Sequence, residues 1–216
     1  MRKFIFTIFL LIFVSIILMI TLLSTFGIDT KRFNNLISDK INKNYNMINI
    51  KLSSVRFKID LKKLKLFLNT ENPLINFRDE NIPVKNLKTY VDFLSIIKTE
   101  PKIDKIVLIL DEIDVDQVKK ISLKLKPSNF RSFLINRVKK GKLIGEIEFY
   151  LNNDNYLDNF IARGSVSSMQ TEINKNLSLF DTNFSFFIDK TDVLIKKFFG
   201  KTDLFNIFDG DINLKF

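Results

Sequence analysis

From about residue 48 onwards, apolar side chains recur at every second position through most of the sequence. Because successive side chains of a β-strand point to opposite faces of a sheet, this spacing predicts a long series of strands with one apolar face each. Turn-forming Asn, Asp and Pro separate the runs in "NTENP" and "RDENIP". Besides the runs considered below, the alternating positions are Ile48, Ile50 and Leu52; Leu87, Thr89 and Val91; Ile121, Leu123 and Leu125; Phe160, Ala162 and Val166; and Phe184, Phe186 and Ile188.

Only two stretches beyond residue 27 have helical spacing. Residues 30–42 follow the possible caps Asp29 and Thr30, and residues 128–139 follow the cap-like Ser128. The sequence therefore predicts a mainly β fold with two short helices. One-sided strands can pack as a sandwich of two sheets or as one sheet curled so that its apolar face lines a groove. Periodicity does not choose between these, and a sandwich core is the simpler interpretation.

The N-terminus has a different pattern, since residues 4–26 contain no charge, Gly or Pro across 23 positions. As a helix this run would measure roughly 34 Å, enough to cross a bilayer. A cleaved signal peptide is the alternative, but the run exceeds the usual apolar segment and Phe26 interrupts a small-residue cleavage site. We expect residues 1–3 to be a cytoplasmic stub, 4–26 a transmembrane anchor and 27–216 a β-rich domain. More basic residues flank the run on its C-terminal side than on its N-terminal side, so charge alone does not fix this orientation.

Composition narrows the chemistry. The chain has no Cys and no His, so it lacks thiolates and the commonest general base and metal ligand. The acidic runs "LDEIDVD" and "DGD" do not have the spacing of a calcium loop and are interpreted as solvated edges or turns. The net charge is +10, but no nucleic-acid motif accompanies it. We expect no catalytic residue, cofactor, metal site or nucleic-acid partner.

Most of the chain also carries a resemblance, which includes the later stretches "GKLIGEIEFYLN" and "NFIARGSVSSMQTEI". After the apolar run come "FGIDTKRFNNLISDKINKN" and then "VKNLKTYVDFLSIIKTEPKIDKIVLIL", in which strands at 84–91 and 102–110 flank a short apolar knot, Phe93 to Ile97. This arrangement resembles the N-terminal portion of the AsmA-like family, the TamB and YhdP type of repeating β-groove lipid-transfer proteins. The sequence departs from the family pattern at Lys98, Thr99 and Glu100, where a Gly often lies. Members of the family are usually much longer, so the resemblance implies that the domain continues in a longer parent protein.

The resemblance favours the groove over the sandwich. It implies a curled, mostly antiparallel, open sheet in the periplasm of an inner-membrane, single-pass protein, with phospholipid acyl chains, the membrane and other envelope proteins as partners. The implied function is phospholipid transport or outer-membrane biogenesis. The alternatives are a single-span jelly-roll bridge component of lipopolysaccharide export and a structural scaffold without a ligand. Under the groove hypothesis, the lipid-facing residues are Val55, Phe57, Ile59, Leu61, Leu64, Leu66, Leu68, Ile106, Leu108, Leu110, Leu143, Ile147 and Phe149.

Overall fold

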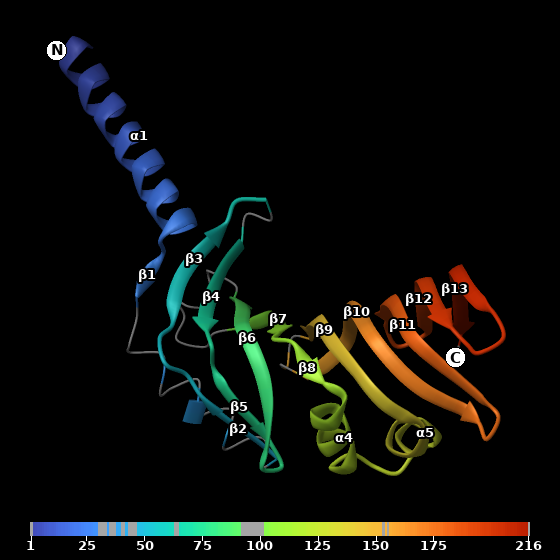
Figure 1. Cartoon of the computed structure of the whole chain (residues 1–216). Coiled ribbons are helices and arrows are strands. Elements are labelled where there is room, and N and C mark those ends of the chain that lie inside the picture. The colour runs from blue at the N-terminus through green and yellow to red at the C-terminus, as the bar shows by residue number, and fades with distance from the viewer. Residues whose placement is uncertain are drawn as a thin grey trace.

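The chain folds into an N-terminal helix and one large antiparallel sheet, shown in Figure 1. The computed structural model describes residues 2–29, 34, 38, 39, 42, 47–62, 65–91, 102–152, 154 and 156–215. The predicted knot lies outside these residues, as does most of the helix predicted at 30–42.

Helix α1 (Arg2–Thr25) is long and apolar enough over Phe4–Thr25 to cross a membrane. Its last turn is tied to the sheet, because the Lys58 ammonium donates a hydrogen bond to the carbonyl of Thr25 (3.1 Å) and Leu23 is buried. Gly27 ends the helix with φ +73, and a Cβ there would lie 2.8 Å from the carbonyl oxygen of Phe57. Only glycine fits this close, left-handed turn between helix and sheet.

The sheet contains 13 strands, and all neighbouring strands that the structure describes are antiparallel. The main path runs β1-β3-β4-β6-β7-β9-β10-β11-β12-β13, with β2 joined through β5 to β6 and β8 paired with β9. The strands are β1 (Ile28–Asp29), β2 (Ile48–Lys51), β3 (Arg56–Asp60), β4 (Lys65–Glu71), β5 (Leu74–Phe77), β6 (Glu80–Val91), β7 (Ile103–Leu110), β8 (Ile113–Asp114), β9 (Val138–Leu151), β10 (Leu157–Asn174), β11 (Leu177–Ile188), β12 (Asp192–Lys201) and β13 (Asn206–Lys215).

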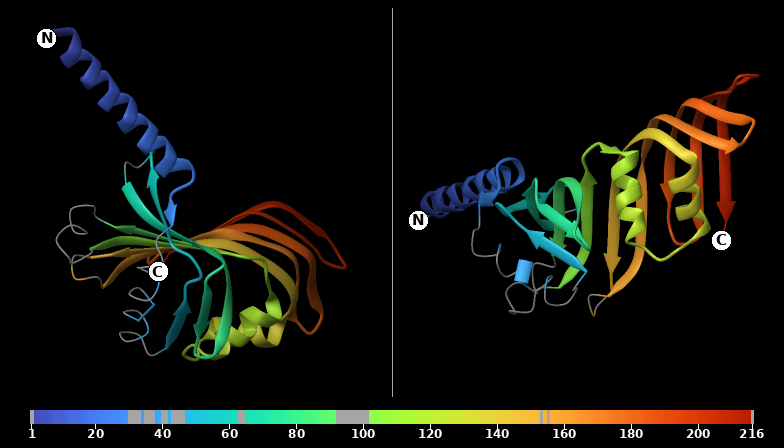
Figure 2. Two further views of the ribbon diagram at one scale, coloured as in Figure 1. Left: turned by 90° about the vertical axis from the view of Figure 1, so that its left-hand side faces the viewer. Right: turned by 60° about the horizontal axis from the view of Figure 1, so that its bottom comes forward.

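Figure 2 shows that the sheet is twisted and curled, and its end strands β1 and β13 are not paired with each other. β-Bulges contribute to this curvature, because each of the four last strands has a non-glycine residue with φ near +50 close to a shift in register. These residues are Ser168, Asp181, Lys197 and Asp209. The mainly β, open, antiparallel fold expected from the sequence is therefore confirmed.

Two helices lie between β8 and β9, α4 (Val115–Leu123) and α5 (Asn129–Arg137). The prediction of α5 is confirmed, including its cap, because Ser128 Oγ accepts a hydrogen bond from the Arg131 amide (3.1 Å). The strand predicted at Ile121, Leu123 and Leu125 is wrong, since α4 ends there. The period of two was coincidental: the exposed side chains of α4, Asp116, Lys120 and Leu123, recur every three or four residues, which is helical spacing.

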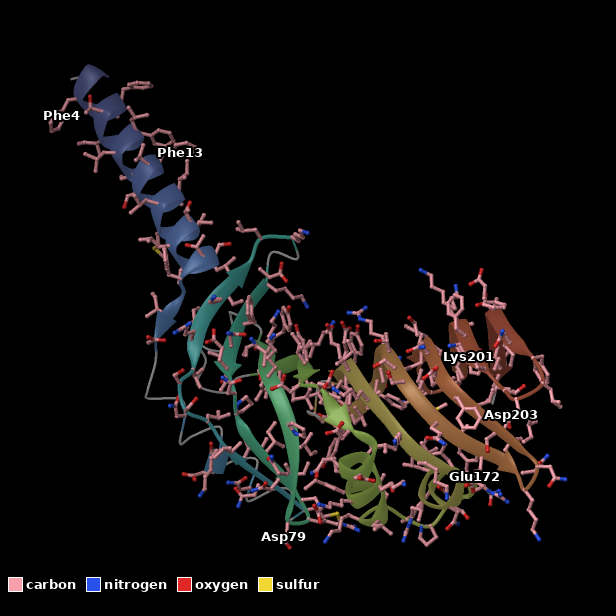
Figure 3. The ribbon with its side chains drawn as sticks, in the orientation of Figure 1. Phe4, Phe13, Asp79, Glu172, Lys201 and Asp203 are labelled. Atoms are coloured by element: carbon pink, nitrogen blue, oxygen red, sulfur yellow. The ribbon has the colours of Figure 1, made fainter. Side chains whose placement is uncertain are left out.

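The remaining turns agree with the expected turn chemistry. Arg78 and Asp79 connect β5 to β6 with φ values of 49° and 70°, which is the conformation of a two-residue hairpin turn. Asn72 has φ 47° between β4 and β5, where the sequence has Asn followed by Pro. These turns place the start of β6 at the end of the sheet far from α1, as Figure 3 shows for Asp79 relative to Phe4 and Phe13.

Candidate functional site

The register of the strands aligns apolar side chains in rows across one face of the sheet. Residues directly opposite each other in paired strands lie on the same face. One row therefore begins in β3 and runs through six strands to β10. In order across the sheet it consists of Phe57, Leu68, Thr89, Ile106, Phe149 and Phe160.

A second row runs parallel to the first and extends to the last strand. Its members lie two residues along each strand from those of the first row, so both rows belong to the same face. Eight strands contribute to it: Thr70, Leu87, Leu108, Ile147, Ala162, Ile188, Val193 and Leu214. We name the surface formed by these two rows and their same-side neighbours the apolar face.

Most of the predicted lipid-facing residues lie on the apolar face and are only half-buried. Side chains in a closed sandwich core would be fully shielded, whereas an open face leaves its side chains partly accessible. Three predicted residues differ: Val55 is 1% exposed, Leu61 is in the turn after β3, and Leu64 lies outside the described residues. The half-buried ones are Phe57, Ile59, Leu66, Leu68, Ile106, Leu108, Leu110, Leu143, Ile147 and Phe149.

Part of the face is covered at the end far from α1. Leu108 and Leu110 pack against a core cluster made by Ile50, Ile75 and Val84. These residues come from β2, β5 and the first half of β6, which form the side branch of the sheet. The most accessible part of the apolar face therefore lies nearer the α1 end and towards the later strands.

Two facing glycines leave space on the apolar face for an aromatic ring. Gly145 of β9 is opposite Gly164 of β10, and both lie on this face. A Cβ on Gly164 would be 2.2 Å from the Ile144 carbonyl oxygen and 2.9 Å from Cζ of Phe186. The pair therefore allows close approach of β9 to β10 beneath the Phe186 ring.

The opposite face carries a charged network. Lys105 binds Glu148, which also accepts hydrogen bonds from Tyr150 (2.5 Å) and Arg163 (2.7 Å). Burial alone raises the pKa of Glu148, but the hydrogen bonds from Lys105 and Tyr150 outweigh burial and lower its pKa to about 2. Burial, together with the charge of nearby Asp60, raises the pKa of Tyr90 to about 12. We name this side the charged face.

A cavity of about 360 Å³ opens on the charged face and is lined by Lys65, Tyr90, Lys105 and Tyr150. The two lysines already bind carboxylates, Lys65 at 3.0 Å from Asp104 and Lys105 with Glu148. Within the described part of the chain, no group of three or more acidic side chains is arranged to hold a metal ion. The acidic runs instead have structural partners: Glu112 binds Lys142, and Asp211 accepts a hydrogen bond from the bulged Lys197 amide (3.2 Å).

No protein-family model, curated protein or solved structure matches the chain. The residues of the apolar face are therefore the basis for any functional assignment. They form a wide apolar wall that can shield hydrocarbon from water.

The lipid-facing residues predicted from the sequence end in β9 and do not include the part of this wall that lies in later strands. The same period of two marks these strands, but bulges interrupt it. The unassigned members are Phe160, Ala162, Val166, Phe184, Phe186, Ile188, Val193, Ile195, Ile212 and Leu214.

Proposed function

We propose that this chain is a membrane-anchored protein that binds lipid acyl chains on the apolar face and contributes to phospholipid transport or outer-membrane biogenesis. The observation that carries the proposal is the row of same-side residues across eight strands, most of them half-buried. At about 4.8 Å between strands the row is roughly 34 Å long. Since a bilayer core of about 30 Å holds two leaflets, each acyl chain needs about 15 Å, and the row exceeds this.

The energetic argument concerns water. An acyl chain that leaves a bilayer loses about 0.8 kcal/mol for each CH₂ exposed to water. An apolar wall that covers one side of the chain recovers part of this free energy without any covalent chemistry. The role is therefore binding and guidance, with no catalytic residue, cofactor or metal assigned to it.

The two faces differ in a way that suits this role better than a scaffold with a closed core. A sandwich would need a second layer over the apolar rows, and the described strands all belong to one sheet. The charged face instead carries Glu148, Lys105 and Arg163, whose charges hydrocarbon cannot solvate. Hydrocarbon would then have one side of the sheet available to it.

The location is part of the proposal. Helix α1 would anchor the chain in the inner membrane, and the sheet would lie in the periplasm with phospholipid as its ligand and other envelope proteins as partners. The tie between Lys58 and the end of α1 supports this arrangement, because it holds β3 next to the end of the helix that would leave the bilayer. The resemblance of most of the chain to AsmA-like proteins supports the same assignment.

Photo-crosslinking tests the proposal. Benzoylphenylalanine at Phe149 or Phe184 on the apolar face should capture phospholipid in cells, whereas the same group at Ser185 should not. Ser185 is the matched control because it is exposed and adjacent to Phe184, and alternation directs it to the charged face. Absence of lipid adducts at both apolar positions, or equal capture at all three positions, would contradict acyl-chain binding.

A further inference from the structure

The helix pair α4–α5, residues 115–137, is strongly basic. This segment has six Lys or Arg side chains and one Asp, so it carries five of the ten excess positive charges of the whole chain. Two more lysines, Lys139 and Lys140, follow directly and are exposed. The helix pair and the residues that follow it therefore form a basic part of the chain.

The same helix pair exposes large apolar side chains. Phe130 is 72% exposed and Phe133 is 43% exposed on the first turns of α5. Leu123 and Leu125, at the end of α4 and just after it, are 50% and 52% exposed. The Arg131 guanidinium donates a hydrogen bond to the Leu125 carbonyl (2.9 Å), which holds this loop against the start of α5. Four exposed apolar side chains therefore lie within one ordered corner among basic residues.

The corner lies at the end of the sheet opposite α1. Gln117 of α4 donates a hydrogen bond to the Asn81 carbonyl (2.6 Å), and Lys124 is 3.8 Å from Glu80, so the helix pair is joined to the first residues of β6. The 12 residues of β6 then run towards the α1 end over roughly 35 Å. Figure 1 and the left view of Figure 2 show α1 at the top and the two helices at the bottom, beyond opposite ends of the first strands. The bilayer that α1 would enter is therefore at the end of the strands far from the corner.

We propose that the α4–α5 corner docks on a second lipid surface that carries anionic headgroups. Lys and Arg attract such headgroups, and exposed Phe and Leu among them enter the boundary between headgroups and acyl chains. The basic side chains could also bind a nucleic acid, but the aliphatic side chains of Leu123 and Leu125 contribute nothing to phosphate contacts. The inference goes beyond acyl-chain binding and does not depend on it, because it concerns a different surface.

The test uses the full chain, held by α1 in nanodiscs of phosphatidylcholine and mixed with free vesicles. Vesicles that contain phosphatidylglycerol should bind and should be released by high salt, whereas vesicles of phosphatidylcholine alone should not bind. The double variant Lys120→Gln/Lys126→Gln removes two exposed charges and should bind about thirtyfold more weakly at low salt. The double variant Phe130→Ser/Phe133→Ser should bind about tenfold more weakly.

The matched control is Leu204→Ser/Phe208→Ser, which removes side chains that are 84% and 74% exposed near the β12–β13 turn, and it should bind as the wild type does. Because the chain has no Trp, a Phe130→Trp variant has a unique fluorophore and keeps an aromatic ring at this position. Brominated lipid placed only in the free vesicles should quench the fluorescence of the Phe130→Trp variant, but not that of a Phe208→Trp variant.

Four results would overturn the proposal: no quenching at position 130, unchanged binding in either corner variant, equal loss in the control, or equal binding of uncharged vesicles. Complete competition by heparin together with normal binding of Phe130→Ser/Phe133→Ser would also overturn it, since the corner would then bind polyanions in general. Loss of vesicle binding with intact lipid crosslinking at Phe149 would separate this surface from the apolar face.

Discussion

Replacing Glu148 by Gln should destabilise the sheet far more than an equivalent change in an exposed ion pair. The Glu148 side chain is 6% exposed and that of its partner Lys105 is 14% exposed. Removing the carboxylate would leave the Lys105 ammonium without its anion in a shielded position, and Arg163 would keep only Glu146 as a partner. Breaking a buried pair in this way typically costs about 3–5 kcal/mol.

The pKa of Glu148 gives a second value for the contribution of its carboxylate to the free energy of unfolding. A carboxyl pKa that falls from 4.5 to about 2 on folding corresponds to about 3 kcal/mol, at 1.36 kcal/mol for each pH unit. Since the folded-state pKa is lowered, this stability is present above about pH 4.5 and is lost as the pH falls towards 2. The wild type should therefore lose stability between these pH values, and the Glu148→Gln variant should lose much less.

Thermal unfolding of the detergent-solubilised chain, followed by circular dichroism, measures both effects. For a domain of this size, about 3 kcal/mol corresponds to a fall in Tm of about 6–12 °C. Glu112→Gln is the control, because it breaks an ion pair with Lys142 in which the side chains are 53% and 50% exposed, and it should change Tm little. Equal shifts in the two variants, or a wild-type Tm that stays constant from pH 5 to pH 2, would refute this account of the charged face.

Two further outcomes are expected. Because Phe4–Thr25 has no charged side chain and is long enough to span a bilayer, the full chain should stay in the membrane after carbonate extraction, and recovery in the soluble fraction with a new N-terminus near residue 27 would show that the segment is cleaved. Gly164→Val should lower Tm by more than about 6 °C, because even a Cβ would approach the Ile144 carbonyl to 2.2 Å. Gly210→Val is the control and should have a small effect, since its Cβ would have neighbours no closer than 3.6 Å. Similar shifts in the two variants would mean that β9 and β10 separate easily.

The alternation of apolar residues predicted β2, β3, β4, β6, β7, β9, β10 and β11, because local spacing alone decides which face a side chain occupies. It did not predict the short strands β1, β5 and β8. It misassigned the end of α4, where Ile121 and Leu123 lie in a helix that also buries Ser122 and Leu125 follows it. Spacing in such a short segment is ambiguous, and the contact that joins α4 to the start of β6, from Gln117 to the Asn81 carbonyl, has no signal in the spacing. The charged pairing of Lys105 with Glu148 was also invisible, because the residues are 43 positions apart in sequence.

Whether the sheet closes depends on β-bulges and their polar partners, which the spacing of apolar residues does not reveal. In β10 the alternation that includes Ala162 and Val166 stops at "SSMQ", and the structure explains the break by a bulge at Ser168, whose amide donates to the side chain of Asn183 in β11 (3.0 Å). In β12 the bulged Lys197 amide is satisfied in the same way by Asp211 of β13. A polar residue on the next strand thus compensates the amide that each of these two bulges frees, and curvature can continue from strand to strand at little cost. The result is a sheet that curls without pairing its first and last strands, and this openness leaves the apolar face half-exposed along the rows that we assign to lipid.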